Sequence, residues 1–142
     1  MVVTAACVSG RRSVAPVAAE LIDAPPHTAF LFARQALVDE GLSLTQSDPE
    51  QGVLETAYLD IASFRPEAAQ YPAAERAVRF RILLAADPDG PGTRLLFQAV
   101  YDPFNTGLAN TRRNERPIPE DHPAMDLVRT VIRRIQRLAE GG

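Results

Sequence analysis

The chain has 142 residues, of which 46% are hydrophobic and 23% are charged, and these proportions predict one globular domain rather than a disordered chain. Its formal net charge of -3 provides no overall basic field, which argues against nucleic acid as a partner. All 15 basic residues are arginines, so enzyme classes that depend on a lysine Schiff base or a P-loop lysine are excluded.

Residues suited to metal or redox chemistry are few. The single cysteine, Cys7, permits neither an intramolecular disulfide nor a zinc site built from cysteines. The two histidines, His27 and His122, lie far apart in the sequence. No apolar run approaches the roughly 20 residues that a membrane-spanning helix needs. We therefore expect no metal, no cofactor and no transmembrane helix.

Small side chains directly precede the cysteine, in the order Thr4-Ala5-Ala6-Cys7. This pattern resembles the lipobox of bacterial lipoproteins, which implies that Cys7 is lipidated and that the residues before it are removed. The charged and apolar parts of such a signal are then expected upstream of Met1. Residues 9–19 are small and polar, as a tether requires. We interpret residues 1–19 as a truncated signal and tether; the alternative is an ordinary terminus with an incidental cysteine.

The first half of the domain, which we place at residues 20–142, alternates between strand and helix patterns. A helix is indicated by apolar residues at helical spacing and by Gly41, a residue type that commonly ends helices. In the strand that follows the next turn, Val53, Ala57, Leu59 and Ile61 are predicted to face the core, with Glu55 as an exception. The expected elements are a strand over 20–24, a helix over 29–40 with Thr28 as N-cap, a strand over 42–45, a turn over 48–52 and a strand over 53–61.

The second half contains the clearest hairpin. Two alternating strands over 76–86 and 94–101 flank the turn-forming run at 87–92, and Arg79 and Arg81 are predicted to point away from the core. Loops are expected at 62–74, with a short helical turn, and at 102–120. The last helix opens at Asp121-His122-Pro123, with Pro123 near its first turn. The order β-α-β-β-β-β-α predicts an α+β fold, an antiparallel sheet with both helices packed on one face.

One stretch has the form helix, glycine, strand, acidic turn, glycine, strand. Its parts are residues 33–37, then 41–44, then Asp48, then 52–56. This run resembles the repeated domain of the BamC lipoproteins, an envelope family that belongs to the bacterial β-barrel assembly machinery. The resemblance implies a non-enzymatic, membrane-tethered accessory module in the cell envelope. If Cys7 is lipidated, Val8 after it favours the periplasmic face of the outer membrane.

Arginine is the strongest predicted surface feature. Arg129, Arg133 and Arg137 recur every four residues opposite the apolar side of the last helix. The preceding loop adds Arg112, Arg113 and Arg116. The guanidinium group pairs well with phosphates and carboxylates, so these residues are candidates for binding anionic lipid headgroups or an acidic partner. The alternative is a solvated helix face that complements the helix dipole.

Two further groups carry weaker hypotheses. Glu120-Asp121-His122 is the only sequence cluster of metal-ligand types, and a capped helix start explains it better than a metal site. Tyr101 and Phe104 stand at the mouth of the long loop, where they either contact a partner or close the edge of the core.

The leading hypothesis is a non-enzymatic interaction module, tethered to the envelope membrane at Cys7 and facing another envelope protein. The sheet edge or the arginine-rich helix would meet the partner. The alternative is a protein that binds a small apolar ligand or a lipid in a cavity between the sheet and the C-terminal helix. The test is whether core side chains fill that space: Phe30, Phe80, Ile82, Phe97 and Ile135.

Overall fold

The computed structural model describes residues 16–104 and 114–141 and shows the predicted α+β fold. Its strands are β1 (Ala18–Ile22), β2 (Leu44–Asp48), β3 (Val53–Thr56), β4 (Leu59–Asp60), β5 (Ala77–Ala86), β6 (Thr93–Tyr101) and β7 (Arg116–Pro117). Its helices are α1 (Pro26–Asp39), α2 (Ala73–Arg76) and α3 (Ala124–Gly141), and two 3-10 turns, Ile61–Ser63 and Pro66–Gln70, precede α2.

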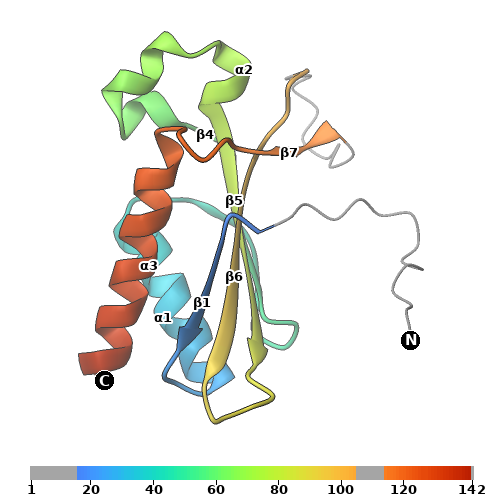
Figure 1. Ribbon diagram of the computed structural model, residues 1–142, viewed down its shortest axis with the longest axis vertical. Helices are drawn as coiled ribbons and strands as arrows, with labels where there is room; N and C mark the ends of the chain where they lie inside the picture. The colour runs from blue at the N-terminus through green and yellow to red at the C-terminus, as the bar shows by residue number, and fades with distance from the viewer. Residues whose placement is uncertain (1–15, 105–113, 142) are drawn as a thin grey trace.

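All seven strands belong to one antiparallel sheet in the order β1-β6-β5-β3-β2, with β4 added to β5 and β7 added to β6. Helices α1 and α3 pack against each other and cover the same face of this sheet, as expected (Figure 1). The sheet therefore has one face under helices and one face without them. The second is called the open face below.

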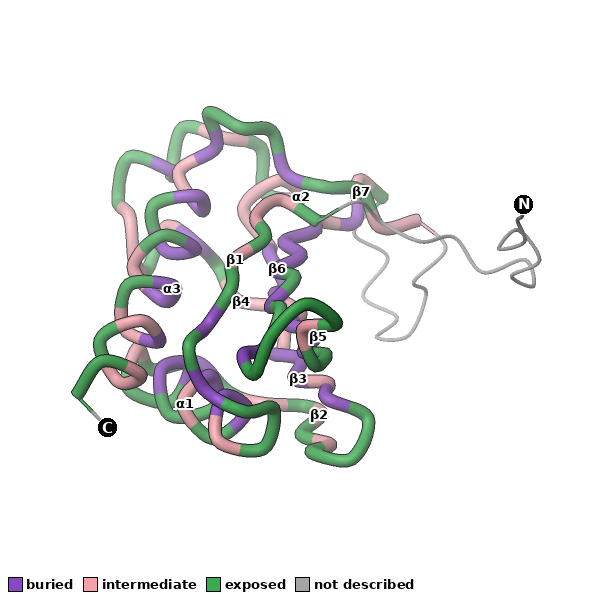
Figure 2. The backbone as a smooth tube through the Cα atoms, turned by 60° about the horizontal axis from the view of Figure 1, so that its bottom comes forward, coloured by how far each residue is buried: buried purple, intermediate pink, exposed green. Residues whose placement is uncertain are grey.

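The core lies between the sheet and the two long helices, where buried backbone gathers in Figure 2. In the central hairpin of β5 and β6, alternate side chains point inward, because successive residues of a strand face opposite sides. Phe80 and Phe97 meet there edge to face, with ring centroids 5.5 Å apart. The inward set matches the prediction and is almost fully buried: Val78, Phe80, Ile82, Leu84, Leu95, Phe97 and Ala99.

Helix α1 begins earlier than predicted. It starts at Pro26 and takes Pro25 as its N-cap, without a side-chain hydrogen bond, so the prediction of Thr28 as the cap is wrong. Proline suits the first helical position because its missing N–H has no partner there in any case. The C-terminal prediction is confirmed: Gly41 has φ +84°, and the Leu42 N–H donates to the Leu37 carbonyl across the helix end.

The first strand also begins earlier than predicted, at Ala18 instead of residue 20. The Val17 N–H already donates a 2.8 Å hydrogen bond to the Phe97 carbonyl. Residues 17–19 therefore lie in or beside the sheet, although the sequence pattern assigned them to the tether. Ala18 and Ala19 have small side chains that carry no strand signal of their own, and the pairing with β6 determines their conformation.

The strand predicted over 53–61 is divided in two, and its predicted core face is wrong at the start. Leu54 pairs with Ile82 and faces the core, whereas Val53 is only half-buried on the other face. The division follows Thr56, whose hydroxyl accepts a 3.0 Å hydrogen bond from the Phe80 N–H in place of a backbone acceptor. After β4 the chain enters a 3-10 turn that buries Ile61.

Candidate functional site

The open face carries a row of apolar side chains across four strands. The strand register places Ala19 beside Leu96, Leu96 beside Leu83, and Leu83 beside Val53. Leu96 is 37% exposed, and Leu21 in the next row of β1 is 61% exposed. We call Ala19, Leu21, Val53, Leu83 and Leu96 the apolar row. A contiguous row of apolar side chains on an uncovered sheet face is a candidate surface for binding a partner.

A charged cluster adjoins the apolar row on the same face and is far less exposed. Arg79 Nη1 lies 3.2 Å from Glu115 Oε2 and 3.6 Å from Glu55 Oε2. The side chains of Arg79 and Glu55 are only 8% and 6% exposed. Arg81 Nε lies 4.0 Å from Glu55 Oε2. We call Glu55, Tyr58, Arg79, Arg81 and Glu115 the polar cluster.

Tyr58 completes the cluster from the segment between β3 and β4. Its hydroxyl donates a 2.8 Å hydrogen bond to Glu115 Oε2, and its ring lies 4.4 Å from the Arg79 guanidinium carbon. Burial, followed by the hydrogen bond to Glu115 and the charge of that carboxylate, raises the pKa of Tyr58 far above its ordinary range. Tyr58 therefore stays protonated and acts as a donor, so it is unsuited to act as a general base.

The sequence pattern reveals part of this cluster. Arg79 and Arg81 point away from the core as predicted, and Glu55, the exception in its strand, is buried against them. Tyr58 and Glu115 were not predicted to take part, because they lie in irregular segments where alternation gives no direction. The sequence signal that points to Glu115 is a general one: a buried arginine needs carboxylates nearby to balance its charge.

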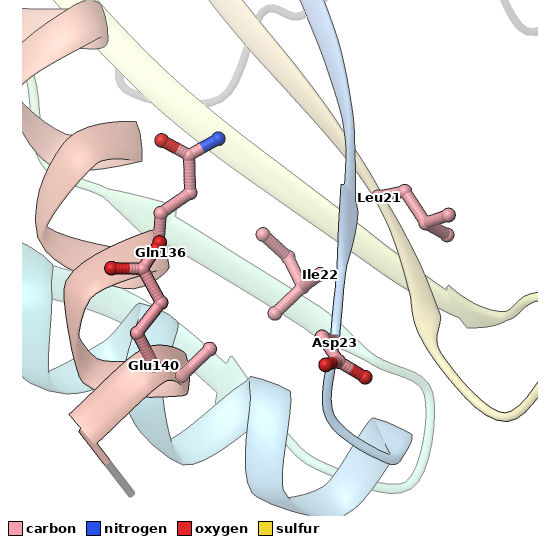
Figure 3. A pocket seen from close by; sticks show the side chains of 6 residues that line it. Leu21, Ile22, Asp23, Gln136 and Glu140 are labelled. Carbon is pink, nitrogen blue, oxygen red and sulfur yellow. The ribbon is translucent and has the colours of Figure 1, made fainter.

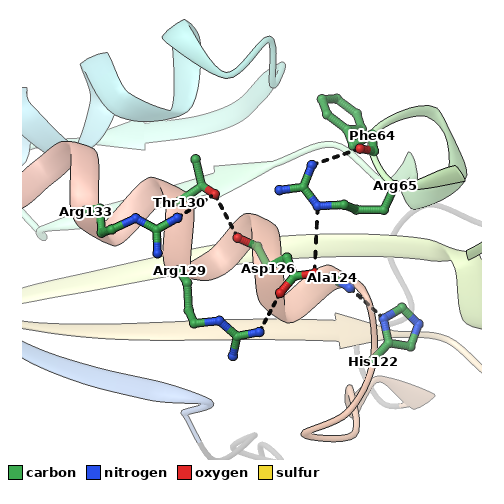
Figure 4. A network of polar contacts seen from close by, with 8 residues as sticks. All are labelled: Phe64, Arg65, His122, Ala124, Asp126, Arg129, Thr130 and Arg133. Atoms are coloured by element: carbon green, nitrogen blue, oxygen red, sulfur yellow. Dashed lines mark hydrogen bonds and ion pairs between the residues drawn. The ribbon is translucent and has the colours of Figure 1, made fainter. Parts of the chain in front are cut away.

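The predicted arginines of α3 are exposed, and two of them have partners within the protein (Figure 4). Arg129 pairs with Asp126 at 2.6 Å, and Arg133 donates to the Thr130 hydroxyl at 3.4 Å. Asp126 also lies 4.0 Å from Arg65, so one carboxylate serves two cations. The stripe is therefore partly neutralised, which favours its interpretation as a solvated helix face.

Arg116, the one arginine of the predicted loop set among the described residues, lies apart from that stripe. Arg116 is exposed on β7, and Figures 1 and 2 both draw β7 and α3 on opposite sides of β6. Arg112 and Arg113 lie outside the described residues. The predicted lipidation residue, Cys7, also lies outside them.

His122 holds the start of α3 in place. Its Nδ1 accepts a 3.0 Å hydrogen bond from the Ala124 N–H, and its Nε2 lies 2.8 Å from the Glu75 carbonyl oxygen. The ring is buried and lies 4.9 Å from the Tyr71 ring. These contacts assign His122 to the helix start, as the capped-start interpretation predicted. Over residues 16–104 and 114–141, no group of three or more His, Cys, Asp or Glu side chains could hold a metal ion.

A shallow groove of about 200 Å³ lies between β1 and the C-terminal part of α3 (Figure 3). Ile22 and Asp23 form one wall, and Gln136, Ala139 and Glu140 form the other, with Leu21 at the rim. The interior of the domain is different. Five side chains that were predicted to fill the space between the sheet and the C-terminal helix are all buried in one hydrophobic cluster: Phe30, Phe80, Ile82, Phe97 and Ile135.

The aromatic pair at the long loop is separated in the structure. Tyr101 packs against the hydrophobic core, whereas Phe104 is 63% exposed. Asp102 lies between them in sequence, and its carboxylate accepts a 2.9 Å hydrogen bond from the Phe104 N–H. Tyr101 thus closes the edge of the core, and Phe104 does not.

No protein family model and no curated protein matches the chain. None of the described helices is long and apolar enough to cross a membrane.

Proposed function

We propose that this protein is a membrane-tethered lipoprotein of the bacterial envelope that acts as an interaction or accessory assembly module, without enzymatic activity. The observation that carries the proposal is the open face. One side of the sheet is covered by α1 and α3 (Figure 1), while the register and the burial of the strand residues place the apolar row and the polar cluster on the other. A partner that covers this row would bury Leu21 and Leu96, which now face water.

The polar cluster supports an interaction role rather than catalysis. Its carboxylates and guanidinium groups are paired with one another, and its phenol is a committed donor to Glu115. Catalytic groups need a reacting atom within hydrogen-bond distance and a suitable pKa. The burial of Phe30, Phe80, Ile82, Phe97 and Ile135 in one core cluster favours the interaction module over the ligand-binding alternative.

The lipobox-like residues before Cys7 support the tether. A lipid anchor would place the protein at the periplasmic face of the outer membrane, where another envelope protein is the expected partner. Nucleic acid is not expected, because the net charge is -3.

The experiment tests both parts of the proposal in cells of the source bacterium. A photo-crosslinking amino acid replaces Ala85, which is exposed on the open face beside Arg94. We expect a discrete protein adduct that Leu96→Glu abolishes and Leu31→Glu leaves intact, since Leu31 is similarly exposed but lies on α1. Intact mass of the N-terminal peptide should show acylated Cys7. An unmodified terminus would refute the tether, and an adduct insensitive to Leu96→Glu would refute the docking face.

A further inference from the structure

We propose that the free edge of β1, together with the groove between β1 and α3, binds an extended peptide segment in which basic and apolar residues alternate. The segment adds to the sheet as a further strand beside β1 and places its basic side chains in the groove. This inference rests on the proposed interaction function and specifies the chemistry of one partner segment.

The edge of β1 is available for pairing. β1 ends the strand order, and within the described residues it pairs only with β6. Its register with β6 runs without interruption from Ala18 to Ile22. The opposite edge strand, β2, has an irregularity between Leu44 and Gln46. Bulges protect an edge from further pairing, so β2 is protected and β1 presents a regular edge.

The groove lies where alternate side chains of an added strand would fall. Successive side chains of such a strand point to opposite faces of the sheet. One set would enter the space between Ile22 and Gln136, and the other would lie beside Leu21 on the open face. Figure 3 shows that Ile22 points toward α3 and Leu21 points away from it. The two sets therefore meet different surfaces, which is how strand addition achieves specificity.

The charges at the groove select a cation. Asp23, directly after β1, and Glu140 on α3 are both exposed and line the groove from opposite sides, and no basic side chain among the described residues lines it. The last turn of α3 adds the negative end of the helix dipole at the same place. Glu20 on β1 accepts a 3.2 Å hydrogen bond from Gln136, one of the residues that line the groove. An arginine or lysine side chain fits these walls, whereas an acidic side chain is repelled.

The apolar requirement comes from the other side of the strand. Leu21 is 61% exposed on the open face, so it offers apolar contact to every second residue of the added segment. A segment with alternating basic and apolar residues satisfies both surfaces, and a segment in which the same residues are grouped does not.

The test uses the full 142-residue chain and synthetic hexapeptides. The probe alternates arginine and valine, the first control alternates glutamate and valine, and the second control groups three valines before three arginines. Amide hydrogen exchange and calorimetric titration report binding. We expect only the alternating arginine peptide to bind and to protect amides of β1. Two further peptides test whether backbone pairing is required: one is N-methylated at the odd-numbered residues and the other at the even-numbered residues. Only one of these sets of amides faces β1, so one of the two peptides should lose binding.

Matched variants test the groove. Asp23→Asn with Glu140→Gln should weaken binding of the arginine peptide by about tenfold, as expected for two solvent-screened ion pairs. Glu67→Gln with Glu120→Gln removes the same charge from exposed positions outside the groove and should leave affinity unchanged. Three results would each overturn the inference. They are an equal affinity for the grouped and the alternating arginine peptides, an equal loss of affinity in both double variants, and amide protection at β2 instead of β1. If the crosslinker at Ala85 gives a protein adduct but no peptide binds to β1, the edge site is refuted and the proposed interaction function is not.

Discussion

The two faces of the sheet are built from the same strands but are stabilised differently. Under the helices, Phe80 and Phe97 are buried among apolar side chains. On the open face, Arg79 is almost as well buried, but against carboxylates and a phenol. Apolar packing tolerates many neighbours, whereas a buried charge depends on particular partners. Single substitutions should therefore affect the two faces by different amounts and for different reasons.

The largest effect is expected from the apolar face. Phe97→Ala should lower the free energy of unfolding by about 3–5 kcal/mol, because it removes a fully buried ring and leaves a cavity beside Phe80. Denaturant unfolding followed by circular dichroism measures this change. A loss below about 1 kcal/mol would show that the core can collapse around the vacancy. The apolar face would then be no more sensitive to substitution than the open face.

The polar cluster should come next. Glu115→Gln keeps an acceptor for Tyr58 but removes the charge that lies 3.2 Å from Arg79. We expect a loss of about 1–3 kcal/mol, because the buried guanidinium of Arg79 loses one of its carboxylate partners. Glu67→Gln is the matched control, since Glu67 is exposed and should change stability by no more than about 0.5 kcal/mol. Equal effects of the two changes would mean that Glu115 is not part of the buried network.

Tyr58→Phe separates hydrogen bonding from charge within the cluster. At neutral pH we expect a loss of about 1 kcal/mol, from the missing bond to Glu115. The pKa of Tyr58 is raised in the folded state, so its contribution is complete below the unfolded value of about 10 and is lost as the pH rises through the folded value. The free energy of unfolding, measured between pH 8 and about 11, should therefore fall less steeply with pH for the variant than for the wild type. If the stability of both proteins fell equally with pH, Tyr58 would not be a buried hydrogen-bond donor.

The smallest effect is expected at the apolar row. Leu96→Ser should change the free energy of unfolding by no more than about 0.5 kcal/mol, because Leu96 is already partly exposed. The measurement is again denaturant unfolding of the isolated protein. A loss above about 2 kcal/mol would show that Leu96 belongs to the fold itself, and the open face would no longer be a surface kept for a partner.

Much of the apolar face could be predicted from the sequence, because alternation in β5 and β6 and the helical spacing in α3 are long and regular. The inward residues of that hairpin are all as expected. Short elements were harder: the pattern of Val53, Ala57 and Leu59 suggested one strand, but the Thr56 hydroxyl takes over a backbone hydrogen bond and divides it. Local pattern contains no information about such a tertiary contact.

The candidate surfaces were predictable only in part. The sequence directs Arg79 and Arg81 outward, yet it does not reveal that Tyr58 and Glu115 meet them from distant segments. The spacing in the sequence indicates the arginine stripe of α3, but the ion pair between Asp126, which also binds Arg129 of the stripe, and the distant Arg65 depends on the three-dimensional arrangement. The β1–α3 groove joins the two ends of the domain, a neighbourhood that no sequence window includes.

The pairing of β1 with β6 also has a consequence for the order in which the chain folds. Ala18, near the start, meets Phe97, which is made long after it. Closing so long a loop costs conformational entropy before the contact can compensate it, and such non-local contacts slow folding. The hairpin of β5 and β6 is local and forms without this cost. During synthesis β1 therefore stays unpaired until β6 has been made, and the pairing of β1 with β6 then completes the sheet.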